Sequence, residues 1–133
     1  LLTYEGDQLV AQVGVEHRVI TLGNREMRPI FGVIDLCVHP NHRNRGLADA
    51  LLDRLETLAR EQNVDFVVLF ADDDRVYKKR DYVHVSNDLT YMGINEGNSL
   101  GILEGSFPDV MMVKPVSKAK WVKGPVDLLG YLF

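Results

Sequence analysis

The sequence lacks several features that would assign it at once to a class. Cys37 is the only cysteine among 133 residues, so the chain forms no internal disulfide and offers neither a four-cysteine zinc site nor a CxxC redox pair. No apolar run approaches the roughly 20 residues that cross a bilayer, and no leader with a cleavage site opens the sequence. We therefore expect a reducing, cytoplasmic setting, with no membrane partner and no metal.

Positive charge is also scarce. Fifteen Lys and Arg residues against nineteen Asp and Glu residues give a net charge of −4, which argues against nucleic acid as a partner. Hydrophobic residues make up 46% of the chain, the ordinary share for one globular domain. We expect residues 1–133 to form that single domain. Because the sequence begins on strand-like residues without an initiator Met, we also expect the first native elements to be missing.

The hydrophobic pattern predicts a mixed α/β domain. A stripe of Ala and Leu from Ala48 to Ala59 marks an amphipathic helix whose opposite face carries charges such as Glu56. A strand on either side of this helix gives a unit with parallel pairing. In chain order we predict strands at Leu1 to Tyr4, Gln8 to Leu22, Ile30 to Val38 and Val64 to Ala71, a helix from Gly46 to Gln62, a short helix from Arg75 to Lys79, and a β-rich segment from Val83 to Phe133.

Local signals add detail to this outline. A polar, breaker-rich connection is expected over residues 23–29. The strand from Ile30 to Val38 is apolar on both faces, which predicts burial on both sides. Asn63 is expected to end the long helix, and Asp72, Asp73 and Asp74 supply caps for the short one.

The most informative stretch is the turn that joins the Ile30 to Val38 strand to the long helix. The start of a helix presents unpaired N–H groups and partial positive charge, which together suit an anion. Gly46 and Ala48 would let a diphosphate approach the backbone, and Arg43 and Arg45 add positive charge nearby. The alternative is that both arginines are solvated turn residues and that Gly46 is only a flexible entry to the helix.

Arg43-Asn44-Arg45-Gly46-Leu47-Ala48 resembles the acetyl-coenzyme A binding motif of the GNAT superfamily of N-acetyltransferases, Arg or Gln, two residues, Gly, one residue, then Gly or Ala. The resemblance implies a central mixed, mostly antiparallel sheet with helices on both faces. It also implies that a strand and one or two helices precede the first hairpin. The residues it assigns to acetyl-CoA are Leu36, Cys37, Val38, Arg43, Asn44, Arg45, Gly46, Leu47 and Ala48.

A second match lies in the short helix. There the family has Phe-Tyr, three residues, then Gly-Phe, and this chain has Val76-Tyr77 followed by Asp81-Tyr82. The resemblance assigns Tyr77 as the general acid that protonates the departing coenzyme A thiolate. Val76 and Asp81 depart from the pattern. If Asp81 does not adopt the conformation that Gly supplies, Tyr77 is displaced.

The attacking amine must lose a proton, so a base is needed as well. Asp35, Glu16 and His17 are candidates, because strands in this region of the family border the acceptor channel. Asp35 is either this base or a hydrogen-bonded structural carboxylate, and Glu16 and His17 are otherwise solvent-facing strand residues. Backbone N–H groups near Cys37 are candidates to hold the oxyanion.

Several other features are expected to be structural. Cys37 lies in an apolar strand, which favours a buried small hydrophobe over a nucleophile. His39 and His42 have no cluster of further ligands beside them and make a poor metal site. Lys114 belongs to a basic stretch with Trp121, which is more typical of a solvated edge than of a nucleic-acid platform.

The function predicted from these patterns is transfer of an acetyl group from acetyl-CoA to a primary amine of a small molecule, aminoglycoside-like or polyamine-like, through a tetrahedral intermediate. Two alternatives stay open. One is a non-catalytic acyl-CoA binding or regulatory module, which the departures at Val76 and Asp81 motivate. The other is transfer to a protein amine. A homodimer is a further expectation, and the chain length of the acyl group is not fixed.

Overall fold

The order of helices and strands follows the sequence pattern closely. The computed structural model describes residues 1–23 and 25–133, so residue 24 of the predicted connection lies outside the described residues. The helices are α1 (Leu47–Glu61) and α2 (Arg75–Lys78), and a single 3-10 turn occupies Pro40–His42. The strands are β1 (Leu2–Glu5), β2 (Gln8–Leu22), β3 (Glu26–Val38), β4 (Phe66–Phe70), β5 (Val83–His84), β6 (Asp88–Asn95), β7 (Asn98–Ser106), β8 (Met111–Pro115) and β9 (Val126–Tyr131).

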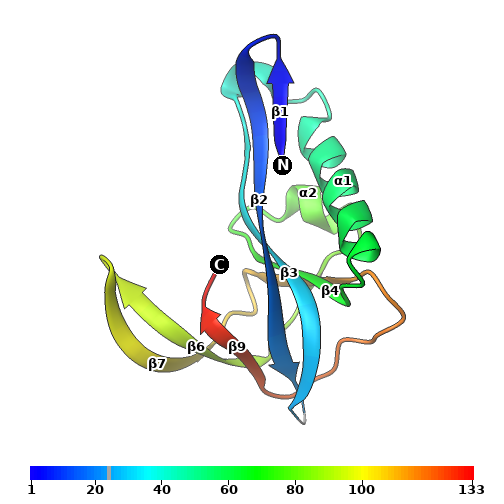
Figure 1. Ribbon diagram of the computed structural model, residues 1–133. Coiled ribbons are helices and arrows are strands. Elements are labelled where there is room, and N and C mark those ends of the chain that lie inside the picture. The colour runs from blue at the N-terminus through cyan, green and yellow to red at the C-terminus, as the bar shows by residue number, and fades with distance from the viewer. Residues whose placement is uncertain (24) are drawn as a thin grey trace.

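Among the described residues, nine strands form one sheet in the order β5-β8-β4-β3-β2-β9-β6-β7, with β1 paired to β2. The pairs β3–β4 and β6–β9 are parallel, and the others are antiparallel. The sheet is strongly curled, so the β6–β7 hairpin swings away from the upper part of β2 (Figure 1). The predicted mixed α/β class, with a mostly antiparallel sheet and a parallel β3-α1-β4 unit, is confirmed.

A bulge in β3 changes the side of the sheet to which its residues point. Between Ile34 and Cys37, β3 gains one residue relative to β2. Asp35 lies in this bulge with φ 49°, a left-handed conformation. Before the bulge Val33 packs against the residues of α1, and after it Leu36 does so. A regular strand would have turned Leu36 to the opposite face.

The burial predicted for β3 holds only in part. Pairing between β3 and β4 ends at Gly32 and Val68, so the last residues of β3 have only β2 beside them in the described part of the sheet. The strand is buried from Ile30 to Val33 and open beyond it. Cys37 is exposed, and the expectation that it is a buried small hydrophobe is wrong because no strand covers this part of β3.

Two clusters of buried side chains lie on opposite faces of the sheet. The first contains Leu52 and Leu55 of α1 together with Tyr77 of α2. The second contains only residues of strands, including Leu89 of β6 and Leu128 of β9. Both helices therefore lie on one face, and the prediction of helices on both faces is wrong for the described residues. The curl of the sheet brings β6 and β9 over the second cluster, where a helix was expected.

Other local predictions have mixed outcomes. Asn63 ends α1 in a left-handed conformation with φ 55°, and the N–H of Val64 donates to the carbonyl of Ala59 at 2.9 Å. Trp121 is not at a solvated edge: its ring packs edge-on against Phe66 at 5.1 Å. The Nε1 of Trp121 also donates to the Oδ1 of Asn87, a buried side chain, at 2.8 Å. No helix in residues 1–23 and 25–133 has the length and apolar character of a membrane crossing.

The bulge gives a direct test of the backbone of β3. Replacing Asp35 by Val should lower the free energy of unfolding by about 1 to 2 kcal/mol, because a β-branched residue is strained at positive φ. Cys37→Val is the matched control, since Cys37 is also exposed on β3 and lacks a positive φ. Chemical denaturation of both variants measures the difference. If Asp35→Val were as stable as Cys37→Val, Asp35 would not lie in a left-handed bulge.

Candidate active site

A single cleft brings the residues of both sequence motifs together. It has a volume of about 650 Å³, and its walls come from the end of β3, from the start of α1 with the turn before it, and from α2. Figure 1 shows α1 and α2 on the same side of β2 and β3. Seven of the nine residues assigned to acetyl-CoA line the cleft, and Tyr77 lines it too; the seven are Leu36, Val38, Arg43, Asn44, Gly46, Leu47 and Ala48.

The start of α1 carries no side-chain cap. Gly46 is the N-cap residue and adopts a left-handed conformation with φ 77°. Asn44, two residues earlier, is also left-handed, with φ 58°. A Cβ added to Gly46 would meet open space, so the glycine is needed for its backbone conformation and also leaves room beside the helix. The N–H groups of the first turn are therefore open toward an acceptor in the cleft.

The two arginines of the turn point in different directions. The Nε of Arg43 donates to the carbonyl of Val38 at 3.3 Å, which keeps this side chain beside the cleft. Arg45 instead pairs with Glu5 of the first hairpin, at 3.2 Å and 3.3 Å, and His42 contacts the same carboxylate at 2.9 Å. Hydrogen bonding and charge from Arg45 lower the pKa of Glu5. Arg45 thus ties the turn to the hairpin and does not line the cleft.

Tyr77 of α2 lines the same cleft as the start of α1. The residue is only 7% exposed, and its ring packs edge-on against that of Tyr82, with 5.5 Å between centroids. Burial raises the pKa of Tyr77 above its ordinary value of 10.0, and the negative charge of Asp73 acts in the same direction. The phenol is therefore held protonated at neutral pH, which is the form that donates a proton.

Asp81 takes the conformation that glycine supplies in the family motif. Its φ is 65°, and the N–H of Tyr82 donates across it to the carbonyl of Tyr77 at 3.2 Å. This is the hydrogen-bond pattern of a helix that ends in a left-handed residue. Asp is among the few non-glycine residues that adopt this conformation at modest cost. The departure from Gly therefore does not displace Tyr77 from the cleft.

Asp73 and Asp74, the two aspartates next to α2, act in different ways. Asp74 is the N-cap residue without a side-chain cap bond, and its carboxylate pairs with Lys78 at 2.7 Å and His84 at 2.9 Å. Asp73 accepts from the backbone N–H of Arg75 at 3.2 Å, so Asp73 provides the capping bond. Hydrogen bonds from Arg75 lower the pKa of Asp73 to about 2.

The candidate bases lie away from the cleft walls. Asp35 is exposed in the bulge, and its exposure removes the need for the buried hydrogen bonds that a structural carboxylate would require. Glu16 of β2 pairs with Arg18 at 3.3 Å, and the His17 ring packs edge-on against Phe31 at 5.2 Å. Cys37 is exposed and, like Asp35 and Arg45, is not among the residues that line the cleft.

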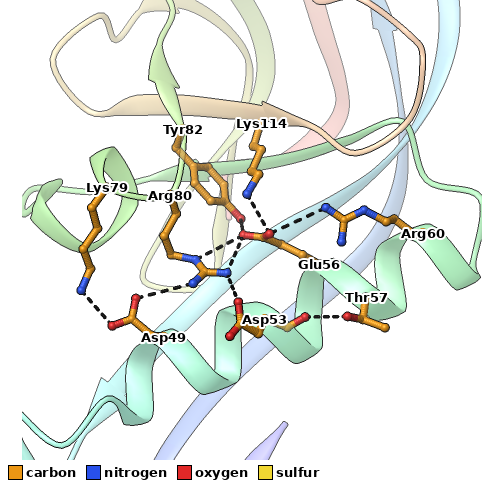
Figure 2. A network of polar contacts seen from close by, with 9 residues as sticks. All are labelled: Asp49, Asp53, Glu56, Thr57, Arg60, Lys79, Arg80, Tyr82 and Lys114. Atoms are coloured by element: carbon orange, nitrogen blue, oxygen red, sulfur yellow. Dashed lines mark hydrogen bonds and ion pairs between the residues drawn. The ribbon is translucent and has the colours of Figure 1, made fainter.

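A buried cluster of charges beside the cleft was not predicted. Glu56, expected on the solvated face of α1, is only 4% exposed and accepts from Lys114 of β8 at 2.7 Å. Arg80 and Tyr82 also contact its carboxylate (Figure 2). Lys114 was expected at a solvated edge, and that expectation is wrong. The two-residue period of β8 could have shown this, because Lys114 shares a face with Met112, which packs on the α1 side.

Among the residues that the structure describes, no group of three or more His, Cys, Asp or Glu side chains is arranged to hold an ion. His39 and His42 contact each other through their rings, with 5.4 Å between centroids. The residues that line the cleft offer anion binding at the start of α1 and proton donation by Tyr77.

Comparisons with known proteins relate the chain to a family and a fold. The sequence model of the Acetyltransferase (GNAT) domain matches residues 1–85. No match is found among curated protein sequences. Of the solved structures, Eis1 from Mycobacterium abscessus is 20% identical with a TM-score of 0.62, over 67% of this chain and 23% of that chain. The chain thus spans less than a quarter of Eis1.

Two further solved structures are similar over more of their length. The GNAT family N-acetyltransferase YhbS from Escherichia coli, solved with CoA, is 18% identical with a TM-score of 0.67, over 95% of this chain and 63% of that chain. An aminoglycoside 6'-N-acetyltransferase, also complexed with coenzyme A, is 13% identical with a TM-score of 0.57, over 90% of this chain and 73% of that chain. At such low sequence identities, the similarity to these structures shows a shared fold and nothing more.

The end of α2 gives a second test. Asp81→Gly should raise the free energy of unfolding by about 0.5 to 1 kcal/mol, because glycine adopts the left-handed conformation without steric cost. Asp81→Ala should lower it, since alanine keeps the steric cost and lacks the short polar side chain of Asp. Thermal and chemical denaturation measure both changes. A loss of stability in Asp81→Gly would contradict the left-handed geometry at this position.

Proposed function

This chain belongs to the GNAT acetyltransferase domain family, and we propose that it transfers an acetyl group from acetyl-CoA to a primary amine of a small molecule. The observation that carries the proposal is the meeting of two features in one cleft, the uncapped start of α1 and the buried phenol of Tyr77. The start of α1 suits the phosphates of coenzyme A, and the Tyr77 phenol suits its departing thiolate. The two solved relatives that hold CoA are consistent with this assignment.

The proposed contacts of acetyl-CoA begin at the turn before α1. Backbone N–H groups of Gly46, Leu47 and Ala48 would donate hydrogen bonds to the diphosphate, and the positive charge of Arg43 would add to the attraction. The open end of β3, where pairing to β4 has ended, offers Leu36 and Val38 as a wall for the pantetheine arm. Arg45 would act at a distance, through its bond to Glu5 that fixes the turn.

The proposed reaction needs two proton transfers. The nitrogen of the amine attacks the thioester carbon, which forms the C–N bond, and the C–S bond then breaks as the tetrahedral intermediate collapses. Tyr77 donates its proton to the leaving sulfur, so coenzyme A departs as the thiol. The amine nitrogen gives up its proton to a base. Asp35 is the candidate: it does not line the cleft, but it is exposed in the bulge directly before Leu36 of the cleft wall. Backbone N–H groups near Cys37 are the candidates for stabilising the oxyanion.

The proposed acceptor is a cationic amine such as an aminoglycoside or a polyamine. The net charge of −4 and the exposed carboxylate of Asp35 favour a positively charged molecule over an anionic one. The aminoglycoside acetyltransferase that shares the fold supports the same class. Incubation with acetyl-CoA and either kanamycin or spermidine, with measurement of the free thiol, tests this function. CoA binding without turnover on an amine panel would favour the non-catalytic alternative.

Tyr77→Phe tests the proton donor. The variant should lose about 100-fold in kcat, within the range for removal of a general acid, while its affinity for CoA stays unchanged because the start of α1 is intact. Tyr4→Phe is the matched control, since Tyr4 is 57% exposed in β1. Steady-state kinetics and calorimetric titration measure the two effects. A kcat equal to that of the native protein would remove Tyr77 from the mechanism.

The raised pKa of Tyr77 also predicts a pH dependence. A general acid works in its protonated form, so loss of kcat through Tyr77 should occur only above pH 10, as the phenol ionises. Tyr77→Phe should lack this alkaline loss. Its kcat should then be low and independent of pH in that range. If kcat of the native protein instead fell at a lower pH, and Tyr77→Phe abolished that fall, the phenol would not be held protonated by burial.

A further inference from the structure

The orientation of Tyr77 depends on contacts outside its own helix. The helix α2 has only four residues, too few to be stable by its own hydrogen bonds. The carbonyl of Tyr77 accepts from the N–H groups of Arg80 at 2.9 Å and Tyr82 at 3.2 Å, and its ring lies against that of Tyr82. Whatever fixes Arg80 and Tyr82 therefore also fixes Tyr77.

Both of these residues are fixed by one carboxylate on α1. Glu56 Oε1 accepts from the Nη2 of Arg80 at 3.2 Å and from the hydroxyl of Tyr82 at 3.3 Å. Its other oxygen accepts from the Nζ of Lys114 at 2.7 Å. Figure 2 shows the side chains of Arg80, Tyr82 and Lys114 converging on Glu56 from two segments distant in the sequence, while Arg60 of the same helix lies farther off, at 3.9 Å. The carboxylate thus joins α1, the end of α2 and β8.

Glu56 differs from the other acidic residues of α1 in its burial. Asp49 and Asp53 also contact the end of α2, through Lys79 and Arg80. Their side chains are 36% and 71% exposed, whereas that of Glu56 is 5% exposed. Exposed ion pairs contribute little because water screens them, while a buried charge with three hydrogen-bond donors holds its partners in one geometry.

The burial of a charge at this place is not explained by stability alone. A buried ion pair is often no more stable than apolar side chains of the same size. The apolar cluster on this face already joins α1 to Tyr77 and Tyr82. A hydrogen bond is directional, whereas apolar packing is not. The hydrogen bond from the Tyr82 hydroxyl to Glu56 fixes the position of the Tyr82 ring, and the Tyr77 ring packs against that ring.

We propose that Glu56 is a positioning residue for Tyr77: through Arg80 and Tyr82 it holds the Tyr77 hydroxyl in the cleft, next to the sulfur of coenzyme A. This inference rests on the proposed role of Tyr77 as the proton donor. Glu56 itself is not among the residues that line the cleft. Its loss should therefore impair the use of Tyr77 and leave the binding of coenzyme A at the start of α1 intact.

The position of Tyr77 can be measured without turnover. In protein labelled with 3-fluorotyrosine, the Tyr77 fluorine signal is assigned by its loss in Tyr77→Phe, and coenzyme A is then added. We expect the Tyr77 signal to shift with coenzyme A in the native protein and in Glu61→Gln, the control on the same helix, because the exposed carboxylate of Glu61 pairs with Arg54 of α1. In Glu56→Gln the signal should move toward that of free fluorotyrosine and lose its response, with calorimetric affinity for coenzyme A within about 2-fold of native.

If Glu56→Gln does not fold, Tyr82→Phe tests the same contact in the fluorine measurement. This variant removes one hydroxyl and keeps the ring and the backbone bonds to Tyr77, so it should change the Tyr77 signal in the same direction by a smaller amount. A Tyr77 signal and a coenzyme A response that are native in either folded variant would overturn the proposal.

A double-mutant cycle on kcat separates positioning from general damage. With acetyl-CoA and an amine that the native protein acetylates, Glu56→Gln should lower kcat by about 10-fold to 100-fold and leave the KM for acetyl-CoA unchanged. In the Tyr77→Phe background it should lower kcat no further. An equal loss in both backgrounds would show that Glu56 acts independently of Tyr77. A native kcat in Tyr77→Phe would instead show that Tyr77 is not the proton donor. The fluorine spectra would still show whether Glu56 holds Tyr77 in place.

Discussion

The architecture of the cleft depends on the point at which β3 separates from β4. The two strands pair in parallel only as far as Gly32 and Val68, although β3 continues to Val38. Beyond that point the bulge at Asp35 turns Leu36 toward α1, so an apolar wall faces the start of the helix. Without early separation the cleft would be filled by a continuous sheet. Without the bulge, its wall would point to the other face of the sheet.

Helix α1 links the two halves of the candidate site. Its first turn, uncapped after Gly46, is suited to bind phosphate, and its third turn carries the buried carboxylate of Glu56 that anchors the end of α2. A 15-residue helix packed on the sheet is a rigid spacer. The distance between the proposed phosphate site and Tyr77 is therefore set by one element, which suits an extended ligand such as coenzyme A.

Much of this site could be predicted from sequence because its signals are local. The period of α1, the glycine at its start and the polar turn before it are all visible within residues 38–62, and the structure confirms the helix there. The bulge at Asp35 and the exposure of Cys37 were not predictable in this way. They depend on which strand lies beside β3 and where that pairing ends, and no residue of β3 alone encodes this.

The burial of the charged cluster around Glu56 could not be predicted from local sequence either. Helical period places Glu56 on the polar face of α1, and that face is exposed unless another segment covers it. Arg80 and Lys114, which do cover it, are 24 and 58 residues away in the sequence. The left-handed Asp81 was doubtful from sequence for a different reason, because Asp adopts that conformation only where the surrounding hydrogen bonds require it.

The central claim is that open N–H groups at the start of α1 bind the diphosphate of coenzyme A. Calorimetric titration of the native protein with coenzyme A and with pantetheine, which carries the same thiol arm without the phosphates and the adenosine that they join to it, tests this claim most directly. We expect coenzyme A to bind at least about 100-fold more tightly, because several charge-assisted hydrogen bonds are lost with the phosphates. Equal affinity for the two molecules, or no binding of coenzyme A, would contradict it.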